Sequence, residues 1–160
     1  TRSGDLDPAV VLYLGRTGGM SLDEIDTLLN RRSGMFGLCG DNDMRAVQER
    51  LAAGDADAEL AFSVYCHRLR KYVGAYYAVL GTVDVIAFTG GVGENSPLVR
   101  QTALAGLEAL GIAVDPARNE RGERLISSDG SAVKVAVIPT DEELEIAQQT
   151  LAVISRTNRQ

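Results

Sequence analysis

A run of apolar residues that ends in a cluster of glycines constrains the fold of this chain more than any other feature. Residues 83–97 read Val-Asp-Val-Ile-Ala-Phe-Thr-Gly-Gly-Val-Gly-Glu-Asn-Ser-Pro. The first half suits a buried strand, and the glycines allow a sharp turn with no Cβ facing a ligand. Asn95 or Ser96 can cap a following helix, and Pro97 fits its first turn. The pattern predicts either an anion or nucleotide site or an ordinary tight strand–helix connection.

Composition excludes several classes of protein. The chain has 160 residues, a net charge of −6 and no basic patch, which argues against nucleic-acid binding. It has no signal peptide and no apolar run long enough to span a bilayer. Its two cysteines, Cys39 and Cys66, form no C-x-x-C pattern, so neither a disulfide framework nor a zinc site is expected. A reducing, cytoplasmic location is therefore predicted.

Helices alternate with short strands along the chain, which predicts an α/β fold. Helix starts are predicted at Asp7-Pro8, at the capping box Ser21–Glu24, near Asp43, near Asp57, after Ser96 and at a second capping box, Thr140–Glu143. The helix after Ser96 is expected to end at Gly111, and the last helix to carry Leu144, Ala147, Leu151 and Ile154. Strands are predicted at 83–88, 133–138 and, briefly, 112–114, whereas 34–42 and 119–131 are interpreted as loops. These strands are too few for a doubly wound sheet, so the missing ones are expected before Thr1.

The longest predicted helix runs from about Asp57 to Leu80. Its apolar stripe comprises Ala61, Tyr65, Leu69, Tyr72, Tyr76 and Leu80. The stripe either packs in the core or contacts a second subunit, and Tyr65, Tyr72 and Tyr76 are the candidates for a dimer contact. His67 is interpreted as a structural or surface histidine.

Three further clusters have the residue types of a phosphate or metal site. Arg2 lies in a polar turn, Thr1–Pro8, from which a guanidinium can bind phosphate oxygens, unless the turn is a charged terminal stub. Asp43 and Arg45 suit a ribose and an adenine ring, or simply a helix cap with a surface ion pair. Glu142 and Glu143 suit Mg²⁺, or the favourable N-terminal end of a helix.

Taken together, these clusters resemble the C-terminal part of the acetate kinase (acetokinase) family. That family belongs to the actin-like, ribonuclease H-like superfamily of acetate and sugar kinases. The matching stretches are Thr-Arg-Ser-Gly-Asp-Leu-Asp-Pro at 1–8, residues 34–45, Phe-Thr-Gly-Gly-Val-Gly-Glu-Asn at 88–95, Ile-Pro-Thr-Asp-Glu-Glu-Leu at 138–144, and parts of the long helix at 65–76. The loop before Asp43 is one residue shorter than is usual in the family.

The resemblance implies a role for each matching residue. Arg2 would stabilise the transferring phosphoryl group, and Glu142, rather than Glu143, would hold Mg²⁺. The adenine nucleotide would contact Asp43, Met44, Arg45, Gly91, Val92, Gly93, Glu94 and Asn95. Glu143 is assigned instead to the capping box.

The implied activity is reversible, Mg²⁺-dependent transfer of a phosphoryl group from ATP to acetate, which gives acetyl phosphate and ADP. A propionate kinase and a catalytically silent nucleotide-binding or dimerisation module are the alternatives. The resemblance also implies a homodimer, and further catalytic groups in an N-terminal half that precedes Thr1. Residues 1–160 would then be a C-terminal nucleotide-binding domain fragment, inactive on its own.

Overall fold

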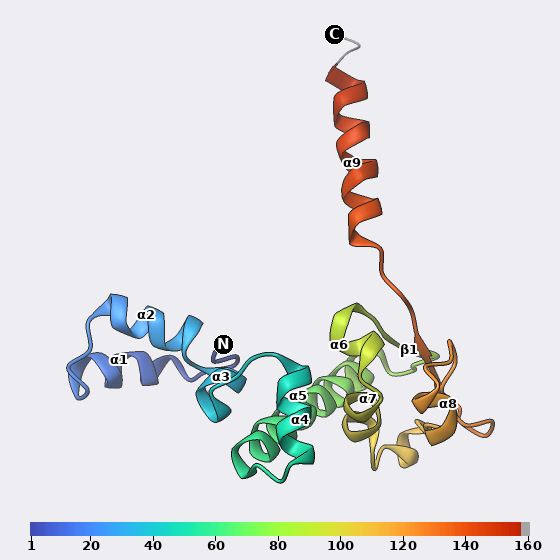
Figure 1. The fold of residues 1–160 in the computed structure, drawn as a ribbon, viewed down its shortest axis with the longest axis horizontal. Helices are drawn as coiled ribbons and strands as arrows, with labels where there is room; N and C mark the ends of the chain where they lie inside the picture. The colour runs from blue at the N-terminus through green and yellow to red at the C-terminus, as the bar shows by residue number, and fades with distance from the viewer. Residues whose placement is uncertain (158–160) are drawn as a thin grey trace. The chain divides into compact units, whose positions relative to one another are not determined.

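The computed structural model describes residues 1–157, which form two compact units. Unit 1 comprises Thr1–Tyr76, and unit 2 begins at Tyr77. Helices dominate both units (Figure 1). None of the helices within residues 1–157 combines the length and the apolar character needed to traverse a bilayer.

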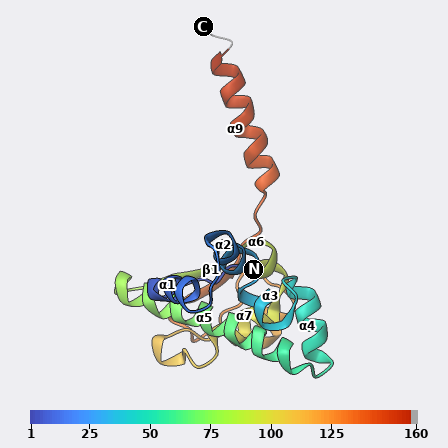
Figure 2. The ribbon, with the colours of Figure 1, turned by 90° about the vertical axis from the view of Figure 1, so that its left-hand side faces the viewer.

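The helices of unit 1 are α1 (Pro8–Arg16), α2 (Leu22–Arg31), α3 (Gly34–Cys39), α4 (Met44–Ala52) and most of α5 (Ala56–Leu80), whose last four residues belong to unit 2. The predicted starts of α1, α2 and α4 are confirmed, because a capping side chain accepts a free first-turn N–H at each. Asp7 caps α1, Ser21 and Glu24 form a complete capping box at α2, and Asp43 caps α4. α1 and α2 pack side by side (Figures 1 and 2), and Ile25 of α2 is buried.

The prediction of a loop at 34–42 is wrong, because α3 occupies most of it. Cys39 in its last turn is buried, and Arg50 Nη1 of α4 donates a 2.7 Å hydrogen bond to Cys39 O. Gly40 ends the helix with a φ of 75° and donates its N–H to Phe36 O. Contacts with α4 thus override the weak helix propensity of a glycine-rich stretch.

α5 has nearly the predicted bounds, but its apolar stripe is core only along the first half. Its buried residues are Ala58, Ala61, Phe62 and Cys66. Large apolar side chains are exposed further along, at Tyr72, Tyr76, Val79 and Leu80. His67 is exposed, which favours the surface histidine of the two alternatives that the sequence left open.

Both cysteines, Cys39 and Cys66, are free and buried. Burial raises the pKa of the Cys66 thiol to about 11. That thiol therefore stays protonated near neutral pH and is a poor nucleophile.

The elements of unit 2 are β1 (Val85–Phe88), α6 (Gly90–Asn95), α7 (Pro97–Leu104), the 3₁₀ helix η1 (Glu108–Leu110), α8 (Pro116–Glu120), β2 (Lys134–Val137) and α9 (Glu142–Thr157). Within residues 1–157 the only sheet pairs β1 with β2 in parallel, with Phe88 opposite Val137. The chain is thus the helix-rich α/β structure with a small sheet that its sequence predicts.

Both strands are shorter than predicted, and only β2 is buried. Val135 and Val137 lie in the core, next to Val133 just before the strand. By contrast, Val85 of β1 is 53% exposed. Within the described residues β1 has a strand neighbour on one side alone, so the prediction of a buried strand is wrong for β1.

The glycine turn is itself a short helix, α6, and the helix predicted after it is interrupted. Ser96 caps α7 by accepting from Val99 N, which confirms one of the two predicted caps. α7 ends at Leu104, because Ala105 is extended and Gly106 has a φ of 79°. Of the part of the predicted helix beyond Leu104, only Glu108–Leu110 is helical, as η1.

The region between η1 and β2 is more ordered than a polar loop. The predicted strand 112–114 is reduced to an isolated antiparallel bridge between Val114 and Ser127. The predicted loop 119–131 contains the end of α8 and the fully buried Ile126. The core of unit 2 comprises Val99, Ala103, Leu104, Ile112, Ile126, Val133 and Val135.

α9 has the predicted position, but its cap differs. Asp141 Oδ1 accepts the 2.9 Å hydrogen bond from Leu144 N, so Asp141 caps the helix. Thr140 donates both its N–H and its hydroxyl to Glu94 instead. The predicted Thr140–Glu143 capping box is therefore wrong. Of the apolar residues predicted on this helix, Leu144, Leu151 and Ile154 are exposed.

Candidate functional site

The parallel pairing of β1 and β2 makes the chain leave both strands at the same edge of the sheet. Ile138 N donates to Phe88 O (2.9 Å), one step beyond the last paired residues. From this edge one segment enters α6 and the other runs towards α9. Between them lies an open depression of about 400 Å³, lined by Gly90, Gly91, Glu94, Thr140, Asp141, Glu142 and Glu143. The predicted nucleotide residues Gly91 and Glu94 thus lie beside the predicted metal ligand, Glu142.

Glycines keep one wall of this depression free of side chains. Gly90 has a φ of 71°, a left-handed conformation that favours glycine. A Cβ at Gly90 or Gly91 would meet no atom within 4 Å, so it would extend into open space. Gly93 differs, because its Cβ would lie 3.3 Å from the backbone carbon of Phe88. Gly93 therefore allows α6 to pack against the end of β1.

The other residues predicted to line the adenosine site differ in their exposure to solvent. Val92 is partly buried. Asn95 is exposed, and its Nδ2 donates to Gly91 O (2.9 Å) within α6. Glu94 Oε1 accepts from Gly90 N (2.8 Å), Thr140 N (2.9 Å) and Thr140 Oγ1 (2.9 Å). These hydrogen bonds lower the pKa of the Glu94 carboxyl, those from Thr140 most strongly, so it is ionised near neutral pH.

A buried arginine, which sequence reasoning missed, donates hydrogen bonds to the last carbonyls of α6. Arg100 of α7 is 0% exposed and donates to the carbonyls of Gly93 (2.9 Å) and Glu94 (2.8 Å). It also donates to Asn119 Oδ1 (2.7 Å) and Asn119 O (2.9 Å). Burial lowers the pKa of the guanidinium. Because four acceptors from α6 and α8 satisfy this cation, it joins the two helices.

In unit 1, the segment that carries Arg2 is clamped against the connection between α2 and α3. Ser3 N donates to Leu29 O (2.8 Å), and Ser33 N donates to Thr1 O (2.9 Å). Gly34 has a φ of 61°, and a Cβ there would lie 2.6 Å from Arg2 O. No other residue fits at position 34 without moving the Arg2 backbone. Nothing local in the sequence signals that the Arg2 segment passes beside Gly34.

A carboxylate ties the same loop to α5. Asp5 Oδ2 accepts from Arg68 Nη2 (2.6 Å), and Asp5 Oδ1 accepts from the Tyr72 hydroxyl (3.1 Å). The hydrogen bond from Arg68 is the largest cause that lowers the pKa of Asp5. Arg2 and Arg68 line a cavity of about 720 Å³ in unit 1, together with Thr1, Ser3, Gly4, Gly34, Met35, Leu38, Asn42, Ala61, Val64 and Tyr65. The Arg2 turn is therefore hydrogen-bonded to its surroundings and lines a cavity.

The predicted nucleotide contacts at 43–45 form a local arrangement. Asp43 Oδ1 accepts from Arg45 N (2.9 Å), and Arg45 Nη2 lies 2.7 Å from Asp43 Oδ2. The Arg45 hydrogen bonds lower the pKa of Asp43 to about 2. Asp43 and Arg45 thus form a helix cap with a surface ion pair, which is one of the two alternatives that the sequence left open. Met44 is buried, with 7% of the residue exposed, so little of it is accessible to a ligand.

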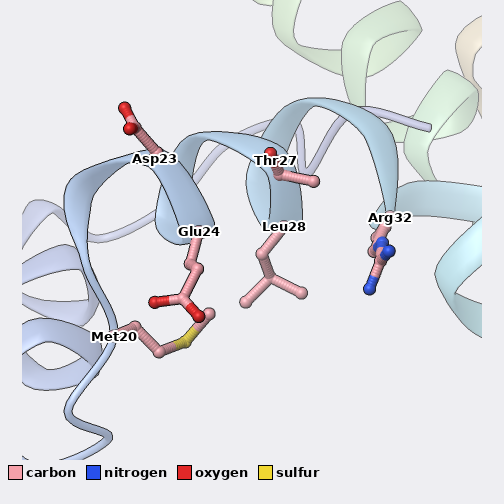
Figure 3. A pocket seen from close by; sticks show the side chains of 6 residues that line it. All are labelled: Met20, Asp23, Glu24, Thr27, Leu28 and Arg32. Atoms are coloured by element: carbon pink, nitrogen blue, oxygen red, sulfur yellow. The ribbon is translucent and has the colours of Figure 1, made fainter.

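A further depression of about 450 Å³ lies along α2, between Met20, Asp23, Glu24, Thr27, Leu28 and Arg32 (Figure 3). None of the predicted site residues is among them. Glu24 is already engaged by Ser21, with its Oε2 accepting from Ser21 N (2.8 Å). This depression therefore has no link to the chemistry predicted for the chain.

The donors beside α6 fit a magnesium–nucleotide complex. Protein sites for such a complex supply one or two carboxylates, and water and phosphate oxygens complete the octahedron. Within the described residues no three His, Cys, Asp or Glu side chains converge on one point. Glu142 is exposed, and its carboxylate forms no salt bridge within that part of the chain. The exposed carboxylates of Glu142 and Glu143 both line the depression next to the glycine wall, so the site supplies the one or two carboxylates that such a complex needs.

Comparison with known proteins identifies the relatives of this chain. The family model described as "Acetokinase family" matches residues 1–148. An acetate kinase of Streptomyces coelicolor is 64% identical over 160 residues, which is 98% of this chain and 39% of that protein. The chain therefore spans about two fifths of the length of such relatives.

Solved structures agree with this match. A crystal structure of Porphyromonas gingivalis acetate kinase has a TM-score of 0.86 at 42% identity, and covers 96% of this chain and 40% of its own. A propionate kinase from Francisella tularensis has a TM-score of 0.87 at 41% identity, and covers 92% of this chain and 38% of its own.

Proposed function

This chain belongs to the acetokinase family, and on that premise we propose that it is part of an acetate kinase. The complete enzyme would transfer the γ-phosphoryl group of ATP to a carboxylate oxygen of acetate. The bond between that phosphorus and the ADP oxygen breaks as the acyl phosphate bond forms. One observation supports this proposal most: the glycine wall of α6 and the free carboxylate of Glu142 line one depression at the carboxyl edge of a parallel sheet.

The proposed roles follow from the chemistry of each side chain. Magnesium, when bound, neutralises phosphate charge, and Glu142 would hold it there. Gly91 leaves room for the nucleotide to approach the backbone, and Arg2 would meet the charge that develops on the phosphoryl oxygens. Asp43 and Arg45 are proposed to contact the nucleotide too, although doing so would compete with their mutual ion pair.

The acyl acceptor is tested by comparing two substrates. The complete protein is supplied with ATP, Mg²⁺ and either acetate or propionate, and the acyl phosphate is trapped with hydroxylamine. We expect a higher kcat/KM for acetate than for propionate. A preference for propionate would make the protein a propionate kinase, a function favoured by the similarity to the Francisella enzyme. Absence of either product from a folded protein that binds ADP would favour a silent nucleotide-binding module.

The placement of this chain within the longer enzyme, its dimerisation and its cytoplasmic location stay predictions. We propose that residues 1–160 form the C-terminal portion, with the remaining catalytic groups encoded upstream. The reading frame of the gene tests this placement, and a match to the N-terminal portion of the relatives would overturn it. Sedimentation of the complete enzyme tests the homodimer, for which the exposed Tyr72 and Tyr76 of α5 are the candidate contacts.

A further inference from the structure

Glu94 lies where the resemblance implies an adenosine contact, but its hydrogen bonds point to a different task. Its Oε1 accepts from Gly90 N in its own helix and from Thr140 N and Oγ1, which lie 46 residues further along the chain than Glu94. These donors occupy one carboxylate oxygen fully, since such an oxygen offers about two lone pairs. The oxygen therefore links α6 to the segment before α9, and its hydrogen bonds with Thr140 form the Glu94–Thr140 clasp.

The clasp lies just beyond the last hydrogen bond between β1 and β2. The last interstrand bond runs from Ile138 N to Phe88 O, and the next residue, Pro139, has no N–H to donate. Beyond it, the Glu94–Thr140 hydrogen bonds hold the two segments together. They replace the ladder for the residues that line the depression.

The clasp also determines where Glu142 lies. Thr140 is held by Glu94, and Asp141 caps α9 through Leu144 N (2.9 Å). Glu142 is the first residue of α9, so its backbone is fixed from both sides. We propose that Glu94 is a positioning residue, which clasps Thr140 and thereby holds the Glu142 carboxylate at a fixed distance from the glycine wall. This proposal rests on the metal-binding role proposed for Glu142.

The clasp couples the two halves of the depression. Any movement of α6 on nucleotide binding is transmitted through Glu94 to the metal-binding segment, and the reverse holds by linkage. Glu94 thus acts through Glu142 and need not touch the nucleotide.

The test uses the complete enzyme and two readouts. Hydrogen exchange of the amides at 140–142, without ligand, reports on the clasp itself. Electron paramagnetic resonance measures the affinity of the ADP-bound enzyme for Mn²⁺, which stands in for Mg²⁺. Glu94→Ala should speed exchange at Thr140 and weaken Mn²⁺ binding, each about tenfold or more, because it removes charge-assisted hydrogen bonds. Thr140→Val, which removes only the hydroxyl donor, should weaken Mn²⁺ binding roughly threefold to tenfold.

Matched variants distinguish the clasp from general damage. Thr140→Ser keeps the donor and should restore Mn²⁺ affinity to that of the wild type. Thr150→Val removes a hydroxyl that donates to Ile146 O within α9, away from the clasp, and should change neither readout. The double variant Glu94→Ala/Thr140→Val should be no worse than Glu94→Ala alone, because the two residues form one interaction.

Each remaining outcome is decisive. Unchanged exchange at Thr140 in a folded Glu94→Ala variant overturns the proposal, as does faster exchange with unchanged Mn²⁺ affinity. Weaker ADP binding with normal Mn²⁺ affinity would make Glu94 a nucleotide contact instead. Glu142→Gln separates this failure from that of the proposed function. If Glu142→Gln leaves Mn²⁺ binding unchanged, the metal role of Glu142 falls and the positioning role falls with it. If Glu142→Gln weakens binding and Glu94→Ala does not, the positioning role alone is wrong.

Discussion

Glu142 in unit 2 and Arg45 in unit 1 are both exposed charged residues in the first turn of a helix, but different contacts hold them. Arg45 is fixed by its neighbour Asp43, which also caps the helix. Glu142 follows a segment that Glu94 holds from 46 residues away, at the edge of the sheet. One arrangement would form in an isolated helix, whereas the other needs the folded unit.

This difference separates local charge pairs from long-range supports. A pair such as Asp43–Arg45 is solvent-exposed, and pairs of this kind contribute little to stability. Arg100 and Glu94 instead satisfy acceptors and donors on separate elements, so their removal leaves several backbone groups without partners. We therefore expect substitutions at the long-range supports to have larger effects than those at the local pairs.

The largest expected effect follows from removing the buried arginine. Arg100→Met in the complete enzyme should lower the free energy of unfolding by roughly 3–5 kcal/mol, because it leaves Asn119 and the α6 carbonyls unsatisfied. Arg121→Ala is the matched control, since it breaks an exposed pair with Glu123 and should cost less than about 0.5 kcal/mol. Urea unfolding measures both, and equal losses would refute the distinction.

Arg2 should matter most for catalysis. Arg2→Ala should lower kcat on the order of 10²-fold or more and weaken ATP binding far less, because the guanidinium meets charge that develops in the transition state. Arg2→Lys should rescue poorly, since an ammonium cannot form the bidentate pair. Steady-state kinetics of acyl phosphate formation tests this, with the exposed Arg16→Ala as control. A nearly normal kcat in Arg2→Ala would remove Arg2 from the catalytic residues.

The two adjacent glutamates of α9 should behave differently. Glu142→Gln should reduce activity about tenfold to a hundredfold and raise the Mg²⁺ concentration needed for half-maximal rate, because it removes the ligand charge. Glu143→Gln should have a smaller effect, as neither cap nor clasp involves it. Magnesium titrations of both variants measure the difference, and the reverse order would exchange their roles.

The glycines of α6 should also separate binding from packing. Gly91→Val should raise KM for ATP about tenfold, since Gly91 lines the depression and a side chain there would extend into open space where the nucleotide is proposed to lie. Gly93→Val should mainly lower the melting temperature, because its Cβ would press on Phe88. Kinetics and thermal unfolding of both variants test this pair, and unchanged nucleotide affinity in folded Gly91→Val would leave the turn a purely structural one.

The smallest effect is expected at the local pair. Arg45 lowers the pKa of Asp43 from 3.8 to about 2, so the contribution of this carboxylate to stability is full above about pH 4. It is lost as the pH falls from about 4 towards 2. The melting temperatures of wild type and Asp43→Asn should therefore differ slightly at neutral pH and converge at pH 2. A difference that stays constant down to pH 2 would contradict the assigned cause.

Sequence reasoning succeeded where the deciding contact is local. The caps at Asp7, Ser21, Asp43 and Ser96 each lie within three residues of the N–H they accept. It failed at α3, whose last turn is held by Arg50 from the next helix, and at Thr140, whose donors go to Glu94 instead of a capping box. The need for glycine at position 34 likewise comes from the Arg2 backbone passing beside it. At each of these places the deciding partner is distant in the sequence, so the local pattern could not identify it.

A structure of the complete enzyme with Mg²⁺ and ADP tests the account of unit 2 most directly. We expect the metal on the Glu142 carboxylate, at an Mg–O distance of about 2.0–2.1 Å or through one bound water. Glu94 Oε1 should still accept from Thr140, while the nucleotide lies against Gly91. A metal held by other residues, with Glu94 turned from Thr140 onto the nucleotide, would contradict both the assigned ligand and the clasp that positions it.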